Sequence, residues 1–102
     1  MTLSSKERAD LRALAHHLPV IVHIGHQGLT ETVRQTLDDA LRTKELVKVQ
    51  FSKNADAKAK DVAGDLAKEL GADVVQTIGR TATLFRDNPE NKKKAYLVRG
   101  DD

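Results

Sequence analysis

Segments with strand periodicity alternate with segments of helical periodicity along most of this chain, and that alternation limits the folds it can adopt. The clearest switch is at residues 46–51, where Val47, Val49 and Phe51 fall on one face of an extended segment. Lys48 and Gln50 fall on the other face. Helical patterns precede and follow this half-buried strand, so the sequence predicts an α/β domain.

The first 24 residues predict a helix followed by a short strand. Ser4 and Glu7 form a capping box, and apolar residues recur at helical spacing until Pro19. The apolar run at residues 20–24 then predicts a strand, on which His23 lies opposite Val22 and Ile24. We favour packing of His23 beneath the first helix over a place on an open sheet face.

Two further helices and a hairpin complete the pattern. Thr30 caps a second helix, which Lys44 and Glu45 end, and Asn54 caps a third helix that ends at Gly71. Their apolar stripes are Val33, Leu37, Ala40 and Leu41 in the second helix, and Ala59, Val62, Ala63, Leu66 and Leu70 in the third. Residues 73–78 and 81–86 predict strands joined by Gly79 and Arg80 in a type II′ turn.

The element order is therefore α-β-α-β-α-β-β, which predicts a two-layer α+β fold of the α/β class. We expect a four-stranded mixed sheet with helices packed on it. Right-handed crossovers between parallel strands would bring the carboxyl ends of the first three strands to one edge. That edge would gather the loop at residues 25–28, Lys53, Lys58 and the Gly79-Arg80 turn, and would leave Lys44 and Arg86 at the opposite edge.

The loop Gly25-His26-Gln27-Gly28 joins the first strand to the second helix and is suited to binding phosphate. Glycines let a ligand approach the backbone, and the first amides of a helix point outward unpaired. A tight turn without a ligand is the alternative reading. An exposed histidine is mostly uncharged at neutral pH, and Glu31 competes with phosphate at the helix start, so charge must come from Lys53, Lys58 and Arg80.

Composition limits the size of the protein and its compartment. With 102 residues, 39% of them hydrophobic, the chain fits one domain, which we place at residues 1–86, followed by a polar, basic tail at 87–102. In that tail Lys92-Lys93-Lys94 is either a solvated run or a contact for RNA phosphate. No segment predicts a signal peptide or a membrane span, and with no cysteine we expect a cytoplasmic protein.

The sequence offers little support for an enzyme. No nucleophile elbow, phosphate-binding P-loop or pair of metal-ligating histidines is present in the context that each requires. Asp38 and Asp39 are adjacent on a helix and therefore point about 100° apart. We expect no catalytic residue, no cofactor and no metal site. Stacking of bases on a sheet, as in an RRM, is disfavoured because aromatic residues make up only 3% of the chain.

The order and spacing of several short segments are specific, namely residues 3–6 with 11–16, 24–31, 45–49, and 76–81 with 84–86. In these segments the chain resembles the CRM domain family (chloroplast RNA splicing and ribosome maturation), in particular its small YhbY-like bacterial members. The resemblance implies a fold similar to the C-terminal domain of a bacterial translation initiation factor, with a G-x-x-G loop comparable to that of KH domains. It also implies RNA binding and association with precursors of the large ribosomal subunit. One departure is that RNA-binding G-x-x-G loops often carry Lys or Arg between the glycines, where this chain has His26 and Gln27.

We therefore expect a monomeric RNA-binding protein that contacts ribosomal RNA during ribosome assembly. The predicted contacts are Gly25, His26, Gln27, Gly28, Lys53, Lys58 and Arg80. One alternative is a protein-interaction module that docks on a ribosomal protein or an assembly GTPase, as the net charge of only +2 would allow. Another is a regulatory domain that binds a small anion or a nucleotide through the glycine loop alone.

Overall fold

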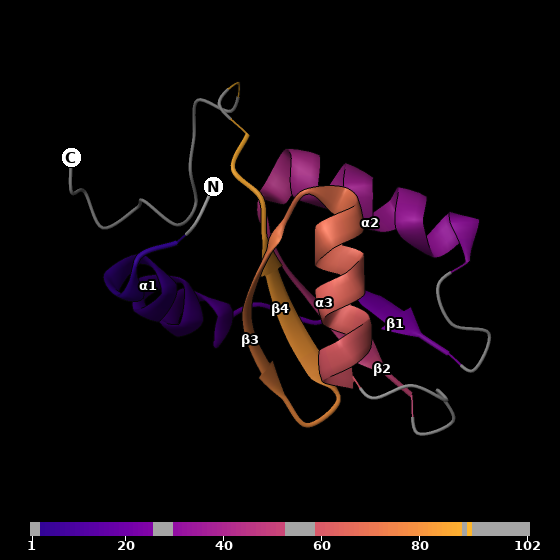
Figure 1. Cartoon of the computed structure of the whole chain (residues 1–102), viewed down its shortest axis with the longest axis horizontal. Helices are drawn as coiled ribbons and strands as arrows, with labels where there is room; N and C mark the ends of the chain where they lie inside the picture. Colours follow the sequence, from indigo (N-terminus) through magenta and orange to yellow (C-terminus); the bar gives the residue numbers. More distant parts are fainter. Residues whose placement is uncertain (1–2, 26–29, 53–58, 89, 91–102) are drawn as a thin grey trace.

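The computed structural model describes residues 3–25, 30–52, 59–88 and 90. Within them the chain forms helices and strands in the predicted order (Figure 1). These are α1 (Ser5–Ala15), β1 (Val22–Ile24), α2 (Glu31–Lys44), β2 (Leu46–Phe51), α3 (Ala59–Leu70), β3 (Asp73–Ile78) and β4 (Thr81–Phe85). The predicted cap at Asn54 and the tail at residues 91–102 lie outside the described residues.

The strands form one mixed sheet in the order β1-β2-β4-β3. Strands β1 and β2 are parallel, and β4 runs antiparallel to both of its neighbours, so β1, β2 and β3 point the same way. The predicted four-stranded mixed sheet is confirmed. The β3–β4 hairpin is also as expected: Ile78 pairs with Thr81, and Gly79 has a φ of +58° while Arg80 stays out of the left-handed region, as a type II′ turn requires.

Helices α2 and α3 cover one face of the sheet. The connections β1-α2-β2 and β2-α3-β3 both advance in the same direction across the sheet, so right-handed crossovers place both helices on the same side. The main core lies between them and the strands. It consists of Val22, Ile24, Leu37, Leu41, Val47, Val49, Phe51, Ala63, Leu66, Ala67, Ala82 and Leu84.

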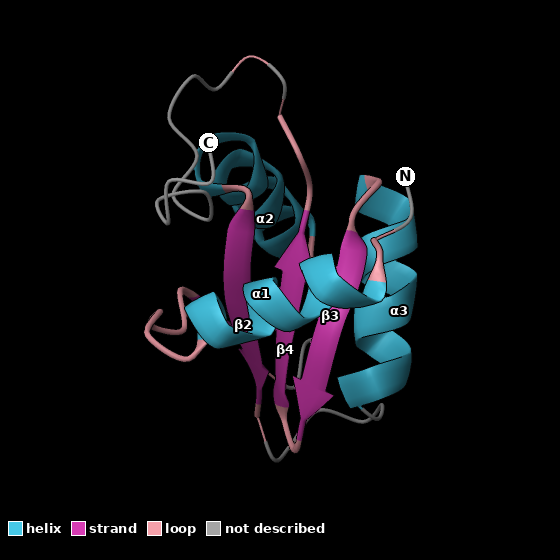
Figure 2. Cartoon of the chain, turned by 90° about the vertical axis from the view of Figure 1, so that its left-hand side faces the viewer, coloured by secondary structure: helices cyan, strands magenta, loops and turns pink. Residues whose placement is uncertain are grey.

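Helix α1 lies on the opposite face, where it crosses β2, β4 and β3 (Figure 2). It covers a smaller cluster made of Leu3, Leu11, Ala15, Leu46, Val75 and Phe85. The sequence predicted two layers, but the structure has the sheet between two helical layers of unequal size. The additional layer is α1, which precedes the first strand and is therefore not a crossover helix.

The start of α1 is formed as its sequence predicts. The Ser4 hydroxyl accepts the Glu7 N–H at 3.0 Å, and the Glu7 carboxylate accepts the Ser4 N–H at 2.9 Å. The helix ends at Ala15, four residues before Pro19, and one further turn leads into the loop. Strand β1 begins at Val22, two residues later than expected, although the Ile21 N–H already donates to the Lys48 carbonyl.

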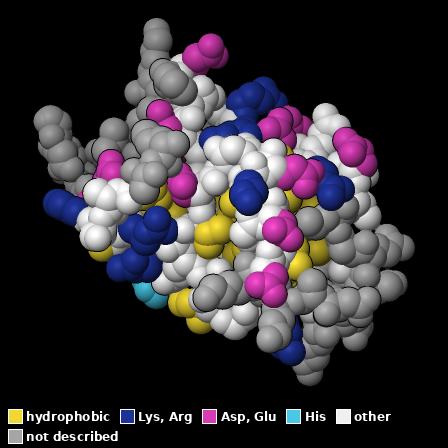
Figure 3. Space-filling model, in the orientation of Figure 1, with side chains coloured by type: hydrophobic (Ala, Val, Ile, Leu, Met, Phe, Trp, Pro, Cys, Tyr) yellow, Lys and Arg dark blue, Asp and Glu magenta, His cyan; other side chains and the backbone are white. Residues whose placement is uncertain are grey.

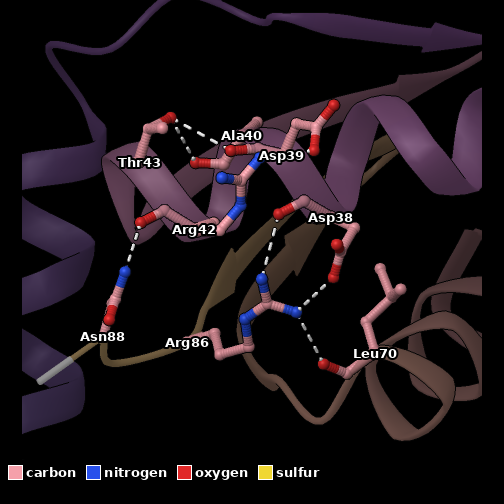
Figure 4. Close-up of polar contacts among 8 residues, drawn as sticks. All are labelled: Asp38, Asp39, Ala40, Arg42, Thr43, Leu70, Arg86 and Asn88. Atoms are coloured by element: carbon pink, nitrogen blue, oxygen red, sulfur yellow. Dashed lines mark hydrogen bonds and ion pairs between the residues drawn. The ribbon is translucent and has the colours of Figure 1, made fainter. Parts of the chain in front are cut away.

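Arg86 joins the two helices of the main layer at the edge predicted to be far from the glycine loop (Figure 4). Its guanidinium donates to the carboxylate of Asp38 at 2.8 Å, to the Asp38 carbonyl at 2.9 Å and to the Leu70 carbonyl at 3.0 Å. Nearby, Glu45 ends α2 with a φ of +67°, and its carboxylate accepts the Asn88 N–H. These bonds fix the chain after β4 against α2.

Candidate functional site

The carboxyl ends of β1 and β2 and the β3–β4 turn meet at one edge of the sheet. The Ser52 N–H donates to the Ile24 carbonyl at 2.9 Å, and the Phe51 N–H donates to the Arg80 carbonyl at 2.7 Å. We refer to Gly25, Ser52 and Arg80 together as the rim. The predicted convergence of the glycine loop with the Gly79-Arg80 turn is confirmed for these described residues.

A shallow pocket of about 420 Å³ opens at the rim. It is lined by His23, Ile24, Gly25, Gln50, Phe51, Ser52 and Arg80. Ile24 and Phe51 are buried, so they close the base of the pocket, while His23, Gln50 and Arg80 are exposed. The pocket therefore combines an apolar base with polar and cationic walls.

Two of the seven predicted site residues are placed by the structure, namely Gly25 and Arg80. His26, Gln27, Gly28, Lys53 and Lys58 lie outside the described residues. The described chain nonetheless reaches the rim just before two of these segments, at Gly25 and at Ser52. The structure gives the place of Gly25 and Arg80, and the contribution of all seven residues to binding stays a prediction.

Gly25 has no need to be glycine for the sake of its own fold. Its φ lies outside the left-handed region, and a Cβ added there would meet no atom within 4 Å. Gly79, by contrast, has the positive φ that its turn requires. A tight turn therefore does not account for Gly25, whereas open space beside its backbone suits the close approach of a ligand.

The start of α2 is less available to an anion than the sequence alone suggests. The Thr30 hydroxyl accepts the Val33 N–H at 3.2 Å, which pairs one of the otherwise free helical amides. Glu31 is exposed in the same first turn and opposes a phosphate there. Positive charge at this edge comes instead from side chains such as Arg80.

The expected packing of His23 beneath the first helix is wrong. His23 is exposed, while Val22 and Ile24 on either side of it are buried against the main core. The reason is the lateral position of β1: it is an edge strand, and α1 packs over β2, β3 and β4. His23 lies on an open part of the sheet beside Gln50, its partner in the register.

Sequence reasoning did not select His23, Gln50 or Ser52 as site residues, although all three line the rim pocket. Gln50 carried a usable signal, because the alternation in β2 had already placed it on the polar face. Ser52 carried one as well, because it directly precedes Lys53, which the crossover rule had placed at this edge.

Charges of both signs are mixed over the described surface. Figure 3 shows Lys and Arg side chains at α1 with Asp and Glu side chains beside them, and both kinds again over α2 and α3. No Asp or Glu is among the described residues that line the rim pocket. The described residues as a whole contain no group of three His, Asp or Glu residues placed to hold a metal ion. They also contain no helix long and apolar enough to cross a membrane.

Residues 3–86 match the family described as the CRS1/YhbY (CRM) domain. The chain belongs to this family. A Haemophilus influenzae relative named "RNA-binding protein" is 40% identical over 92 residues, which cover 89% of this chain and 92% of that protein. A Bacillus subtilis relative named "Probable RNA-binding protein YqeI" is 36% identical over 91 residues, which cover 89% of this chain and 95% of the relative.

The fold agrees with this family membership. The solution structure of the Staphylococcus aureus protein SAV1595 superposes with a TM-score of 0.76 at 34% sequence identity. The match covers 89% of this chain and 95% of that structure. The CRM domain therefore extends over nearly all of the described elements.

Proposed function

We propose that this CRM domain protein binds RNA through the rim, and that its target is ribosomal RNA or a precursor of the large ribosomal subunit during assembly. The observation that carries the proposal is that Gly25 and Arg80 meet at one sheet edge beside a pocket whose described lining residues include no carboxylate. The relatives named as RNA-binding proteins support the same class of ligand.

Each of the seven predicted site residues has a task in this proposal. Gly25 and Gly28 admit the sugar-phosphate backbone, and His26 and Gln27 offer hydrogen bonds or a stacking surface to it. Arg80, Lys53 and Lys58 neutralise phosphates. Because the whole chain has a net charge of only +2, this local concentration of cations decides where a polyanion binds.

In this proposal the protein is a non-enzymatic cytoplasmic monomer with two parts. Residues 1–86 form the RNA-binding domain, and residues 87–102 form a polar tail in which Lys92-Lys93-Lys94 adds a further phosphate contact. The hydrogen bonds from Asn88 to Glu45 and to the Arg42 carbonyl attach the beginning of this tail to the end of α2.

The dependence of RNA affinity on salt tests the role of the rim. Removing one phosphate contact by Arg80→Ala is expected to reduce the slope of log affinity against log salt by about one unit. The measurement is fluorescence anisotropy with a ribosomal RNA fragment at several salt concentrations. Arg42→Ala is the matched control, because it removes the same charge from an exposed arginine at the opposite edge and is expected to leave the slope unchanged.

Three outcomes would redirect the proposal. Equal slopes for Arg80→Ala and the unsubstituted protein would exclude the rim as the RNA contact. Binding to a purified ribosomal protein that survives nuclease and high salt would instead favour the protein-interaction module. Heat released on titration with mononucleotides would favour the regulatory anion-binding domain.

The identity of the RNA requires an experiment in cells. Crosslinking followed by RNA sequencing is expected to enrich a ribosomal precursor. Gly28→Asp places a carboxylate in the proposed path of the backbone and is expected to abolish that enrichment. Recovery of the same RNA from the Gly28→Asp protein would argue against the glycine loop as a contact.

A further inference from the structure

The sheet face that carries α1 is covered over only part of its length. Its first row of side chains, Leu46 and Phe85, packs beneath α1 together with Val75. The row beyond α1 consists of Lys48, Thr83 and Gln76, which are neighbours in the register across β2, β4 and β3. A last row crosses all the strands at the rim end and consists of His23, Gln50, Thr81 and Ile78. We call these two rows the open face.

A β-bulge in β3 determines what the open face contains. Val74 pairs with Leu84, but Gln76 pairs with Thr83, so Val75 is an extra residue. Because side chains alternate along a strand, the extra residue moves Gln76 and Ile78 from the side of the main core to the α1 side. Arg8 of α1 donates a hydrogen bond to the Val74 carbonyl beside the bulge.

The open face is concave and has the charge of an anion-binding surface. A pocket of about 200 Å³ lies under the end of α1 and is lined by Ala15, His16, Lys48, Gln76, Ile78, Thr81 and Thr83. It adjoins the rim pocket, because Thr81 in one pocket pairs with Gln50 in the other. His16, Lys48, His23 and Arg80 line the two pockets, and no carboxylate lines either among the described residues.

The chemistry of the open face matches nucleotide bases in addition to phosphates. Ile78 is 60% exposed, and among the described residues no other large hydrophobic side chain is exposed. Gln76, two residues before Ile78 on β3, and Gln50, beyond Thr81 in the same row, each carry an amide donor and an acceptor, the combination that reads the edge of a base. An acidic peptide would need only the cations, whereas a base would use the apolar contact and the amides as well.

We propose that the open face receives the unpaired bases of a single-stranded RNA segment whose backbone runs along the rim. This inference rests on the proposed function and specifies its ligand. In a double-stranded RNA the bases are stacked and paired, so they cannot reach a sheet face, while splayed bases of a loop or single strand can. Ile78 contacts the face of a base, and Gln76 and Gln50 bond to base edges, so this mode does not depend on the aromatic stacking of an RRM, which the low aromatic content disfavours.

The test compares two RNA probes with the full chain by fluorescence anisotropy. One probe is a labelled single strand of about 12 nucleotides, within the usual range of single-strand binding sites, and the other is the same sequence as a duplex. Gln76→Ala and Ile78→Thr are each expected to weaken single-strand binding by roughly three- to tenfold and to leave duplex binding within about twofold. Thr77→Ala is the matched control, since Thr77 is on the same strand but faces the side of α3.

The outcomes separate this proposal from the proposed function. If Arg80→Ala weakens binding but Gln76→Ala and Ile78→Thr do not, or if they weaken both probes equally, the open face is not a base site while the rim remains an RNA contact. If the unsubstituted protein binds neither probe, the proposed function itself fails. Competition by poly-glutamate as strong as that by RNA of equal charge would assign the face to an acidic protein segment instead.

Nuclear magnetic resonance gives a second readout that does not depend on substitutions. Titration with the single strand is expected to shift the amide signals of Gln50, Gln76 and Ile78 and to leave those of α2 unchanged. Shifts confined to the rim, with none along β3, would overturn the proposal.

Discussion

The same strands present two very different faces. Toward α2 and α3 the register places Val49 beside Ala82 and Val47 beside Leu84, all of them buried. Toward α1 the row of Leu46 and Phe85 is apolar and covered. The next two rows are polar except for the exposed Ile78, and their side chains are exposed or half-buried except for the buried Thr83. Neighbouring residues of one strand therefore differ in role: one side stabilises the domain, and the other leaves polar side chains at the surface.

Substitutions of comparable size on the two faces should separate stability from binding most strongly. Leu84→Ala removes a fully buried side chain from the main core and is expected to lower the free energy of unfolding by about 2–5 kcal/mol. Gln50→Ala on the open face is expected to change it by less than about 0.5 kcal/mol. Equilibrium urea denaturation measures both values.

RNA affinity should show the reverse order at a temperature where both variants are folded. Gln50→Ala is expected to weaken binding of the single strand, and Leu84→Ala is not. Equal losses of stability on the two faces would break the comparison, because the open face would then be a structural surface.

Arg86 offers a way to weaken the helical layer without touching either face. Arg86→Ala removes three hydrogen bonds that join α2 to the end of α3, and we expect a loss of about 1.5–3 kcal/mol in the free energy of unfolding. RNA affinity is expected to be unchanged, since Arg86 follows the end of β4 far from the rim. Denaturation and anisotropy on the same sample check both expectations.

Arg86→Lys refines this prediction. A lysine keeps the charge but lacks the planar fork that reaches two carbonyls and a carboxylate together. Most of the loss should therefore persist in Arg86→Lys. A full recovery of stability by lysine would show that only the charge near Asp38 matters.

Gly25 tests whether the rim belongs with the binding face. Because a Cβ at Gly25 meets no atom within 4 Å, Gly25→Ala is expected to change the free energy of unfolding by less than about 0.5 kcal/mol. If RNA backbone approaches there as proposed, the added methyl group should hold the RNA away from the protein backbone. Affinity should then fall by about tenfold, the size of effect expected from losing one charge-assisted hydrogen bond.

Gly64→Ala is the matched control for Gly25→Ala. Gly64 is exposed within α3, where alanine is the better helix former, and its added Cβ also meets no atom within 4 Å. It is expected to stabilise the protein by about 0.5–1 kcal/mol and to leave affinity unchanged. An equal loss of affinity in both variants would remove the special role of Gly25.

The elements of this fold could be predicted from sequence because their signals are local. The capping box at Ser4, the alternation in β2 and the Gly79-Arg80 turn each lie within a few residues, and each is confirmed. The shared direction of β1, β2 and β3 followed from the crossover rule, and with it the meeting of Gly25 and Arg80 at one edge.

The open face could not be predicted because it depends on pairing between distant strands. Val74 and Val75 are identical in chemistry, so nothing local marks Val75 as the extra residue of the bulge. His23 was misplaced for a related reason: a three-residue strand does not reveal that it lies at the edge of the sheet, beyond α1. The helical stripe of α1 likewise gave no indication of which face it would cover.

The position of β4 also has a consequence for how the domain is made. Among the described residues it is the last strand in the chain, yet it lies between β2 and β3, and β3 joins the sheet only through it. In a nascent chain that stops before Thr81, no strand ladder joins the β1–β2 pair to β3. The domain therefore cannot assemble strand by strand during translation, and the core closes only once Phe85 has been added.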